Sequence, residues 1–237
     1  MIDAGGIGEV TSINLYQGSP QISGGGCQGI SVLRMFANDA EIDWLSGWCG
    51  GDPWSDGDQN MGGHIRFKTG LDAFIHNKRA SKNGIEVIGE KGVFYADFES
   101  FRLFKYRGDE KSRLYSDLVE VPGLFPDAKH WGPDLDADGW QSMSTRQAHS
   151  IQSMIDAMDQ DIEPRCSGED MRKALEIAIA FRESHRRGHA PVKLPIQDRS
   201  QKIVPVDRRL KNKKETMGEA AYKESISSHT RARTPAD

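Results

Sequence analysis

The stretch GGGCQG, from Gly24 to Gly29, has the spacing G-x-G-x-x-G and runs into an apolar segment, ISVLRMFAND. This spacing is typical of a turn that holds a dinucleotide pyrophosphate at a helix N-terminus. Such a turn begins directly after a strand and is followed about 20 residues later by an acidic residue that binds the ribose. Here a loop separates Gly24 from the strand predicted at Glu9 to Tyr16, and hairpins follow the helix. The stretch therefore favours a loop that caps a helix and lets a ligand approach it closely.

The segment DLDADG, from Asp134 to Gly139, has the acidic first, third and fifth positions and the sixth-position glycine of a calcium-binding loop. The twelfth position, which is a bidentate Glu in such loops, is Thr145, and Pro133 is incompatible with the helix that leads into them. An ordinary solvated acidic loop is the simpler interpretation.

The histidines also invite a search for metal or triad spacing, but none lies in an H-x-x-x-H or H-E-x-x-H pattern, and no G-x-S-x-G occurs. His64 and His76 fall on opposite arms of one predicted hairpin and could meet across it, although a surface pair is the simpler interpretation. His185 and His189, with the two arginines between them, could hold an anion, but cations at a helix C-terminus are what the helix dipole favours. The sequence thus predicts no metal site and identifies no catalytic residue.

Composition excludes several classes of protein. The chain has 237 residues, a net charge of -4 and 37% hydrophobic residues, so it carries no overall basic field that would recruit nucleic acid. No apolar run approaches the roughly 18 residues that a membrane-spanning helix needs. The three cysteines lack C-x-x-C spacing, which is typical of reduced thiols in a cytosol, and no secretory signal follows Met1. We expect a cytoplasmic protein with neither a nucleic-acid nor a membrane partner.

Alternating apolar residues predict a run of short strands in the first half of the chain. The segments EIDWLSGW, HIRFKTGLDAFIH, GIEVIGEKGVFYA, FRLFKY and LYSDLVEV alternate in this way, with glycine-containing turns inside two of them. Tight turns between consecutive strands imply antiparallel neighbours. The pattern predicts a meander of about six strands.

Helices are expected on either side of this meander. One of about three turns begins near Gln28, a second carries the stripe Ile151, Met154, Ile155 and Met158, and a third begins at a capping box of Ser167 and Asp170 and ends at Gly188. The predicted class is α+β, with an open, mostly antiparallel sheet and helices packed on one face. Residues 1–205 would form this domain, and residues 206–237 a flexible basic tail.

Several stretches together resemble, in this order, the C-terminal half of the glucose-fructose oxidoreductase and inositol dehydrogenase (Gfo/Idh/MocA) family. The resemblance covers about residues 1–205 and rests on the stretches GGIGEVTSI, GGGCQGISVLRMFANDAEIDWLSGW, DPWSDGDQNMGGHIRFKTG, GIEVIGEKGVF and ALEIAIAFRESHRRGHAPVKLPIQDRS. It implies an α+β domain that supplies substrate contacts and a subunit interface. It further implies that the N-terminal Rossmann domain, which binds NAD or NADP, and the lysine of the family's E-K-P motif are absent. The chain alone would then bind no cofactor and transfer no hydride.

The resemblance also implies substrate-binding residues. In the family a glycine-rich loop leads into a helix that presents a His and, three residues later, an Asp to the substrate; these positions fall on Gln28 and Ser31, next to Gly26 and Cys27. Gln has no proton that titrates near neutral pH, so it cannot be a general base, but its amide can bind a sugar hydroxyl. The expected partners are a sugar-like small molecule and further copies of the chain, in a homodimer or homotetramer formed through the sheet face. The alternative is a stand-alone, non-catalytic sugar-binding or assembly module.

Overall fold

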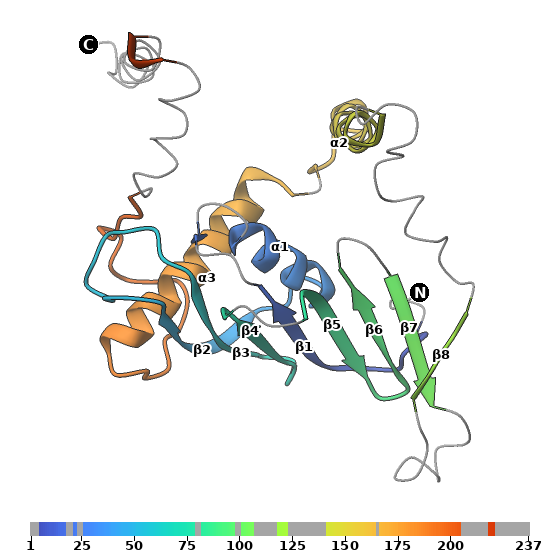
Figure 1. Ribbon diagram of the computed structural model, residues 1–237, viewed down its shortest axis with the longest axis horizontal. Helices are drawn as coiled ribbons and strands as arrows, with labels where there is room; N and C mark the ends of the chain where they lie inside the picture. Colours follow the sequence, from blue (N-terminus) through green and yellow to red (C-terminus); the bar gives the residue numbers. More distant parts are fainter. Residues whose placement is uncertain are drawn as a thin grey trace.

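The computed structural model describes residues 5–17, 21–22, 26–78, 82–97, 101–106, 118–122, 141–164, 166–204 and 218–220. Figure 1 shows its elements in chain order: β1 (Val10–Tyr16), α1 (Cys27–Phe36), β2 (Ile42–Cys49), β3 (Met61–Phe67), β4 (Asp72–His76), β5 (Gly84–Gly89), β6 (Gly92–Ala96), β7 (Phe101–Tyr106), β8 (Leu118–Glu120), α2 (Gln141–Asp159) and α3 (Gly168–Arg186). The predicted α+β class is confirmed.

The described strands form one open sheet in the order β2-β3-β4-β1-β5-β6-β7-β8. Neighbours are antiparallel except for β1 and β4, so the mostly antiparallel prediction is confirmed. The predicted number of about six strands is wrong, because this sheet has eight. Strand β1 was predicted at Glu9 to Tyr16 but not as part of the meander; it lies between β4 and β5 and joins two hairpin-linked groups, a long-range pairing that leaves no mark in local sequence periodicity. Strand β8 is only three residues long and lies within LYSDLVEV, one of the stretches predicted to be a strand.

One face of the sheet is buried under α1 and α3 (Figure 1). Strand β4 illustrates the alternation, since Ala73 and Ile75 are buried while Phe74 and His76 lie on the opposite face. We call that opposite face the outer sheet face. Its larger side chains from β1 to β6 are Tyr16, Trp44, Trp48, His64, Arg66, Phe74, His76, Glu86 and Tyr95. Trp48 is 42% exposed and Phe74 36% exposed, so part of this aromatic surface faces solvent.

Helix α3 has the capping that the sequence predicts. The Ser167 hydroxyl accepts a hydrogen bond from the Asp170 amide, and the Asp170 carboxylate accepts one from the Ser167 amide. At the other end the chain leaves the helix through Gly188, whose φ of 66° is in the left-handed region that glycine tolerates best. Local chemistry thus determines both ends of this helix.

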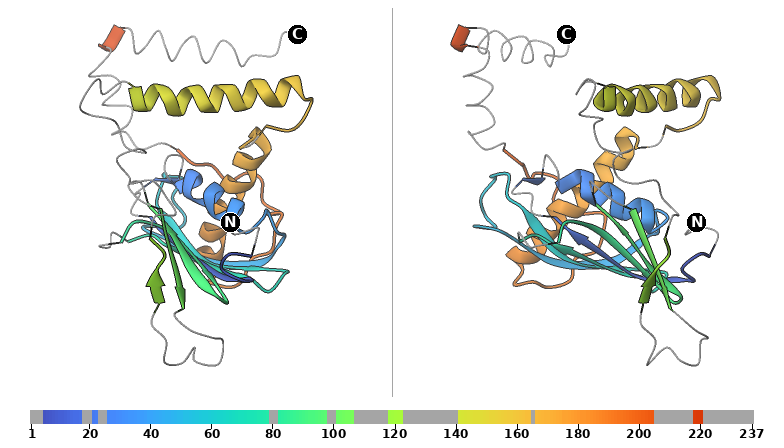
Figure 2. Two further views of the ribbon diagram at one scale, coloured as in Figure 1. Left: turned by 90° about the vertical axis from the view of Figure 1, so that its right-hand side faces the viewer. Right: turned by 45° about the vertical axis from the view of Figure 1, so that its right-hand side comes forward.

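Helix α2 is present as predicted, but its apolar stripe is not buried among the described residues. Each of Ile151, Met154, Ile155 and Met158 is at least 44% exposed. Both views in Figure 2 show α2 standing apart from the sheet, beyond α1 and α3. The i, i+3, i+4, i+7 spacing predicted the helix and its apolar face, but not what that face packs against.

Two predictions fall on residues outside those described: the acidic segment 134–139 and most of the basic tail 206–237. The boundary near residue 205 therefore stays a prediction. In the described part of the chain, no helix has both the length and the apolar character needed to cross a membrane.

Candidate functional site

The candidate site is the N-terminal end of α1. Strand β1 ends at Tyr16 and α1 begins at Cys27, so the glycine-rich stretch does not directly follow a strand. The Gly26 amide donates a hydrogen bond to the Gln21 carbonyl (3.2 Å), which closes the connecting loop just before the helix. A Cβ at Gly26 would lie 2.9 Å from that same oxygen. This close approach of backbone to backbone is a structural reason for glycine at this position.

The four predicted substrate-binding residues do not converge on one surface. Gln28 is exposed, whereas Gly26 and Cys27 are buried. Ser31 is half-buried, and its Oγ donates a hydrogen bond to the Met171 sulfur on α3 (3.5 Å). The helical repeat of 3.6 residues explains the split, since consecutive positions point about 100° apart. Of the four residues, Gln28 is the one whose side chain is most available to a ligand.

Cys27 has the properties of a packing residue. Burial, together with the nearby Asp58 carboxylate, raises the pKa of its thiol from 9.0 to about 11. At neutral pH the side chain is therefore a neutral thiol, which lacks the thiolate character that a nucleophile or metal ligand needs.

A small cavity with both polar and apolar lining residues lies beside the start of α1. Its volume is about 10 Å³, close to that of a single water site. Three amide side chains line it, those of Gln17, Gln21 and Asn60. Sequence reasoning missed these residues, because they come from two separate connections, β1 to α1 and β2 to β3, and form no motif.

A larger groove, of about 420 Å³, lies at the opposite end of α1. It is lined by the start of β1, the end of α1 and the turn between β3 and β4. None of the four predicted substrate-binding residues contributes to it.

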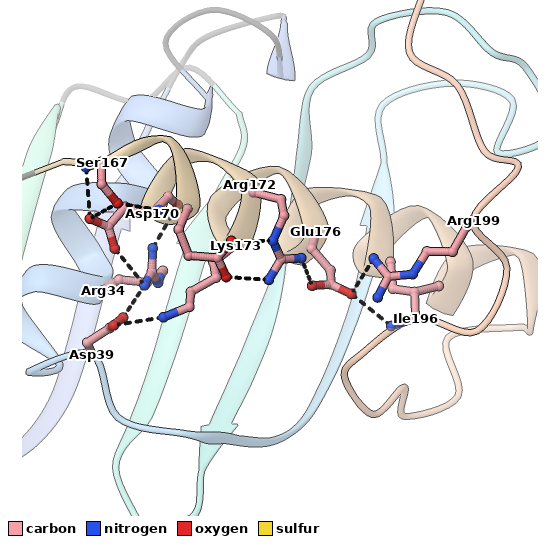
Figure 3. Close-up of polar contacts among 10 residues, drawn as sticks. Arg34, Asp39, Ser167, Asp170, Arg172, Lys173, Glu176, Ile196 and Arg199 are labelled. Carbon is pink, nitrogen blue, oxygen red and sulfur yellow. Dashed lines mark hydrogen bonds and ion pairs between the residues drawn. The ribbon is translucent and has the colours of Figure 1, made fainter. Parts of the chain in front are cut away.

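Helix α1 is held against α3 by the buried Arg34 (Figure 3). Its guanidinium donates to the backbone carbonyl of Asp170 (2.8 Å) and forms ion pairs with the Asp170 carboxylate (3.2 Å) and with Asp39. Lys173 pairs with the other oxygen of Asp39 (3.2 Å). Hydrogen bonds from Ser167, followed by the Arg34 interaction, lower the pKa of the Asp170 carboxyl. This network ties α1, the helix that carries Gln28, to α3.

Further along α3, the same polar row reaches the segment that follows the helix. Glu176 is buried and pairs with Arg172 (2.9 Å) and Arg199 (3.2 Å). Its carboxylate also accepts a hydrogen bond from the Ile196 amide (3.0 Å), as Figure 3 shows. The C-terminal segment is therefore fixed to the same helix that holds α1.

The two histidine pairs considered from sequence differ: His64 and His76 stack on separate partners, whereas His185 and His189 stack on each other with ring centroids 4.7 Å apart. His64 stacks on Phe74 and contacts Asp72 (2.7 Å), whereas His76 stacks on Tyr16. His185 lies 3.2 Å from the Cys49 sulfur, and His189 donates to the Gly47 carbonyl (2.9 Å). Across the described residues, no group of three His, Cys, Asp or Glu side chains is arranged to hold a metal ion.

Solved structures of NAD-dependent oxidoreductases share this fold. An oxidoreductase from Agrobacterium radiobacter, in complex with NAD+, L-tartaric acid and magnesium, aligns over 81% of this chain with a TM-score of 0.54 and 15% identity. An NAD-binding oxidoreductase from Klebsiella pneumoniae aligns over 83% with a TM-score of 0.56 and 13% identity. A levoglucosan dehydrogenase, in complex with NADH and levoglucosan, aligns over 82% with a TM-score of 0.55 and 17% identity.

This chain spans only part of those proteins, namely 59%, 62% and 61% of their respective lengths. At such identities the likeness establishes the fold. No family model matches the sequence, and no curated protein matches it either.

Proposed function

We propose that this chain is the C-terminal substrate-binding and oligomerisation domain of a Gfo/Idh/MocA-like NAD(P)-dependent oxidoreductase that acts on a sugar, a polyol or a related cyclic compound. The observation that carries the proposal is the shared fold, which spans about three fifths of several NAD-dependent oxidoreductases. The described sheet is mostly antiparallel and is not the parallel, doubly wound sheet of a dinucleotide-binding domain. Hydride transfer would therefore require NAD or NADP held by another domain, and the chain alone would bind neither.

The chemistry of the candidate site supports a neutral, hydroxyl-rich ligand. The exposed amide of Gln28 is an uncharged group that both donates and accepts hydrogen bonds. Such groups suit hydroxyls better than carboxylates or phosphates, which favour Arg or Lys.

One feature favours a second candidate, a stand-alone sugar-binding or assembly module without catalytic activity. Gln28 occupies the position at which the resembling family has a His, and an amide cannot accept the proton of a reacting hydroxyl. The reading frame upstream of Met1 distinguishes the two. An in-frame strand, G-x-G-x-x-G turn, helix and E-K-P motif would support the oxidoreductase; a stop codon and ribosome-binding site would support the module.

Replacing Gln28 with alanine should weaken binding of levoglucosan or myo-inositol about fivefold, because one hydrogen bond is worth about 1 kcal/mol. Isothermal titration calorimetry would measure the affinity, and urea unfolding should show unchanged stability. Val32→Ala, an exposed change one turn further along α1, is the matched control and should bind normally. If Gln28→Ala destabilised the fold while its folded fraction bound the ligand with the wild-type affinity, Gln28 would have a structural role.

We further propose that the outer sheet face is covered by a second copy of the chain. An open sheet with exposed aromatic side chains is a poor surface to leave in water. Placing a charge in this face with Phe74→Glu should dissociate the oligomer without unfolding the domain. Size-exclusion chromatography with light scattering would report the mass, and Val32→Glu on α1 is the control. A monomeric wild type, or an unchanged mass for Phe74→Glu, would refute this interface.

A further inference from the structure

Asp58 is a buried acidic residue between β2 and β3, with 3% of its surface exposed. Its Oδ1 accepts a hydrogen bond from the backbone amide of Ile22, at a distance of 2.7 Å. Ile22 is itself buried, and it lies in the loop that leads into α1. A buried carboxylate is costly unless hydrogen bonds compensate the lost water, so this bond constrains where the loop can lie.

The loop that Asp58 holds is the one that starts the candidate site. Gln21, the neighbour of Ile22, accepts the hydrogen bond from the Gly26 amide. Gly26 is followed at once by Cys27 and Gln28 in the first turn of α1. A shift of Ile22 would therefore move the first turn of the helix.

The backbone of Asp58 is held from the other side by the C-terminal segment. The Asp58 amide donates to the Val204 carbonyl (3.0 Å), and the Val204 amide donates to the Asp56 carbonyl (2.7 Å). The fully buried Arg182 on α3 ties the same two segments together, because it donates to the carbonyls of Ser55 (3.2 Å) and Lys202 (2.7 Å). Asp58 thus joins the loop before α1 to the C-terminal segment 202–204.

We propose that Asp58 is the positioning residue of the candidate site: it fixes the loop that starts α1 and couples that loop to the C-terminal segment 202–204. The meaning of this role for a ligand rests on the proposed function. The role of Asp58 in holding the loop does not rest on the proposed function, and the reactivity of Cys27 measures that role directly. Cys27 is in the first turn of α1, is buried, and lies close enough to Asp58 for the carboxylate charge to act on its thiol.

The test is the pH profile of Cys27 alkylation by iodoacetamide, with peptide mass mapping to identify each cysteine. In Asp58→Ala the loop should detach and Cys27 should become exposed. If its thiol pKa falls from about 11 to its ordinary value of 9.0, the thiolate fraction at pH 8 and hence the alkylation rate should rise about 100-fold. Cys49, which is buried at the end of β2, should keep its wild-type rate and serves as an internal control.

A conservative variant separates positioning from general damage. Asp58→Asn keeps an oxygen that can accept the hydrogen bond from the Ile22 amide, so Cys27 should stay protected. The pKa of its thiol should nevertheless fall, because the neighbouring charge is gone. Asp56→Ala removes an exposed carboxylate two residues away and should leave the profile unchanged. Alkylation of Cys27 at the wild-type rate in Asp58→Ala, or an Asp58→Asn protein as reactive as Asp58→Ala, would overturn the proposal.

The coupling to the C-terminal segment has its own variant. Val204→Pro removes the backbone N–H that donates a hydrogen bond to the Asp56 carbonyl. Val204 itself is 52% exposed. Cys27 alkylation should then rise about tenfold, less than in Asp58→Ala because the carboxylate remains. An unchanged rate would show that the C-terminal segment does not act on the loop. None of these alkylation measurements needs a substrate, so a negative result in them would not contradict the proposed function. Likewise, a failure of the protein to bind sugars would not contradict the role of Asp58.

Discussion

Arg34→Met should lower the free energy of unfolding by about 2 to 3 kcal/mol, toward the low end of the range for breaking a buried ion pair. The Arg34 side chain is only 7% exposed, and its loss would leave the carboxylates of Asp39 and Asp170 without their shared cation. Both carboxylates are partly open to water, which softens the penalty. Urea unfolding followed by tryptophan fluorescence would measure the difference. Because α1 then loses its main polar tie to α3, exchange of its amide hydrogens should also accelerate.

The pH dependence of this effect follows from the lowered pKa of Asp170. A carboxyl whose pKa is lower in the folded state than in the unfolded state stabilises the fold at pH values above its unfolded-state pKa. This contribution is lost as the pH falls through the folded-state pKa. The difference in free energy of unfolding between wild type and Arg34→Met should therefore become smaller below about pH 4. Lys68→Met, which removes an exposed pair with Glu41, is the control and should leave the free energy of unfolding almost unchanged. An equal effect of the two substitutions would contradict the role given to Arg34.

Gly63→Ala should destabilise the domain by about 3 kcal/mol, because it inserts a methyl group where α3 packs directly on the sheet. A Cβ at Gly63 would lie 2.6 Å from the Gly47 Cα and 2.8 Å from the Phe181 ring, and it would also clash with the Ser46 carbonyl. Phe181 is fully buried, so the ring has nowhere to move. Thermal unfolding by circular dichroism would show a lower midpoint.

The control for this substitution is a glycine on α3, the helix that packs against Gly63. Gly168 is in the first turn of α3, and a Cβ there would meet nothing within 4 Å. Gly168→Ala should raise stability by about 0.4 to 1 kcal/mol, because alanine restricts the unfolded chain more than glycine does. A Gly63→Ala protein as stable as wild type would mean that β2 and β3 can separate from α3 at little cost.

The features that could be predicted from sequence are those with local causes. Both ends of α3 were predictable because Ser167, Asp170 and Gly188 act through their immediate neighbours in the chain. The position of α1 was predictable in the same way, since apolar spacing marks its buried face. The hairpins from β2 to β4 and from β5 to β7 likewise follow from alternation and tight turns.

The remaining features depend on residues far apart in sequence. Arg34 meets Asp170 at a separation of 136 residues, and Asp58 meets Ile22 at a separation of 36. Nothing in the neighbourhood of either residue indicates such a partner. The candidate site shows the same division. The helix that carries Gln28 could be predicted, but not that Ser31 would turn toward Met171 or that the amide of Asn60 would lie behind the helix.

The central place of β1 has a consequence for how the domain folds. Among the described strands of this sheet β1 comes earliest in the chain, yet its partners β4 and β5 come much later: Asn14 and Glu86, which face each other across β1 and β5, are 72 residues apart. Contacts of such long range close large loops and slow folding. During synthesis residues 10–16 would lack both sheet partners until β4 and then β5 have been made, and a chaperone that binds extended apolar segments would find a target there.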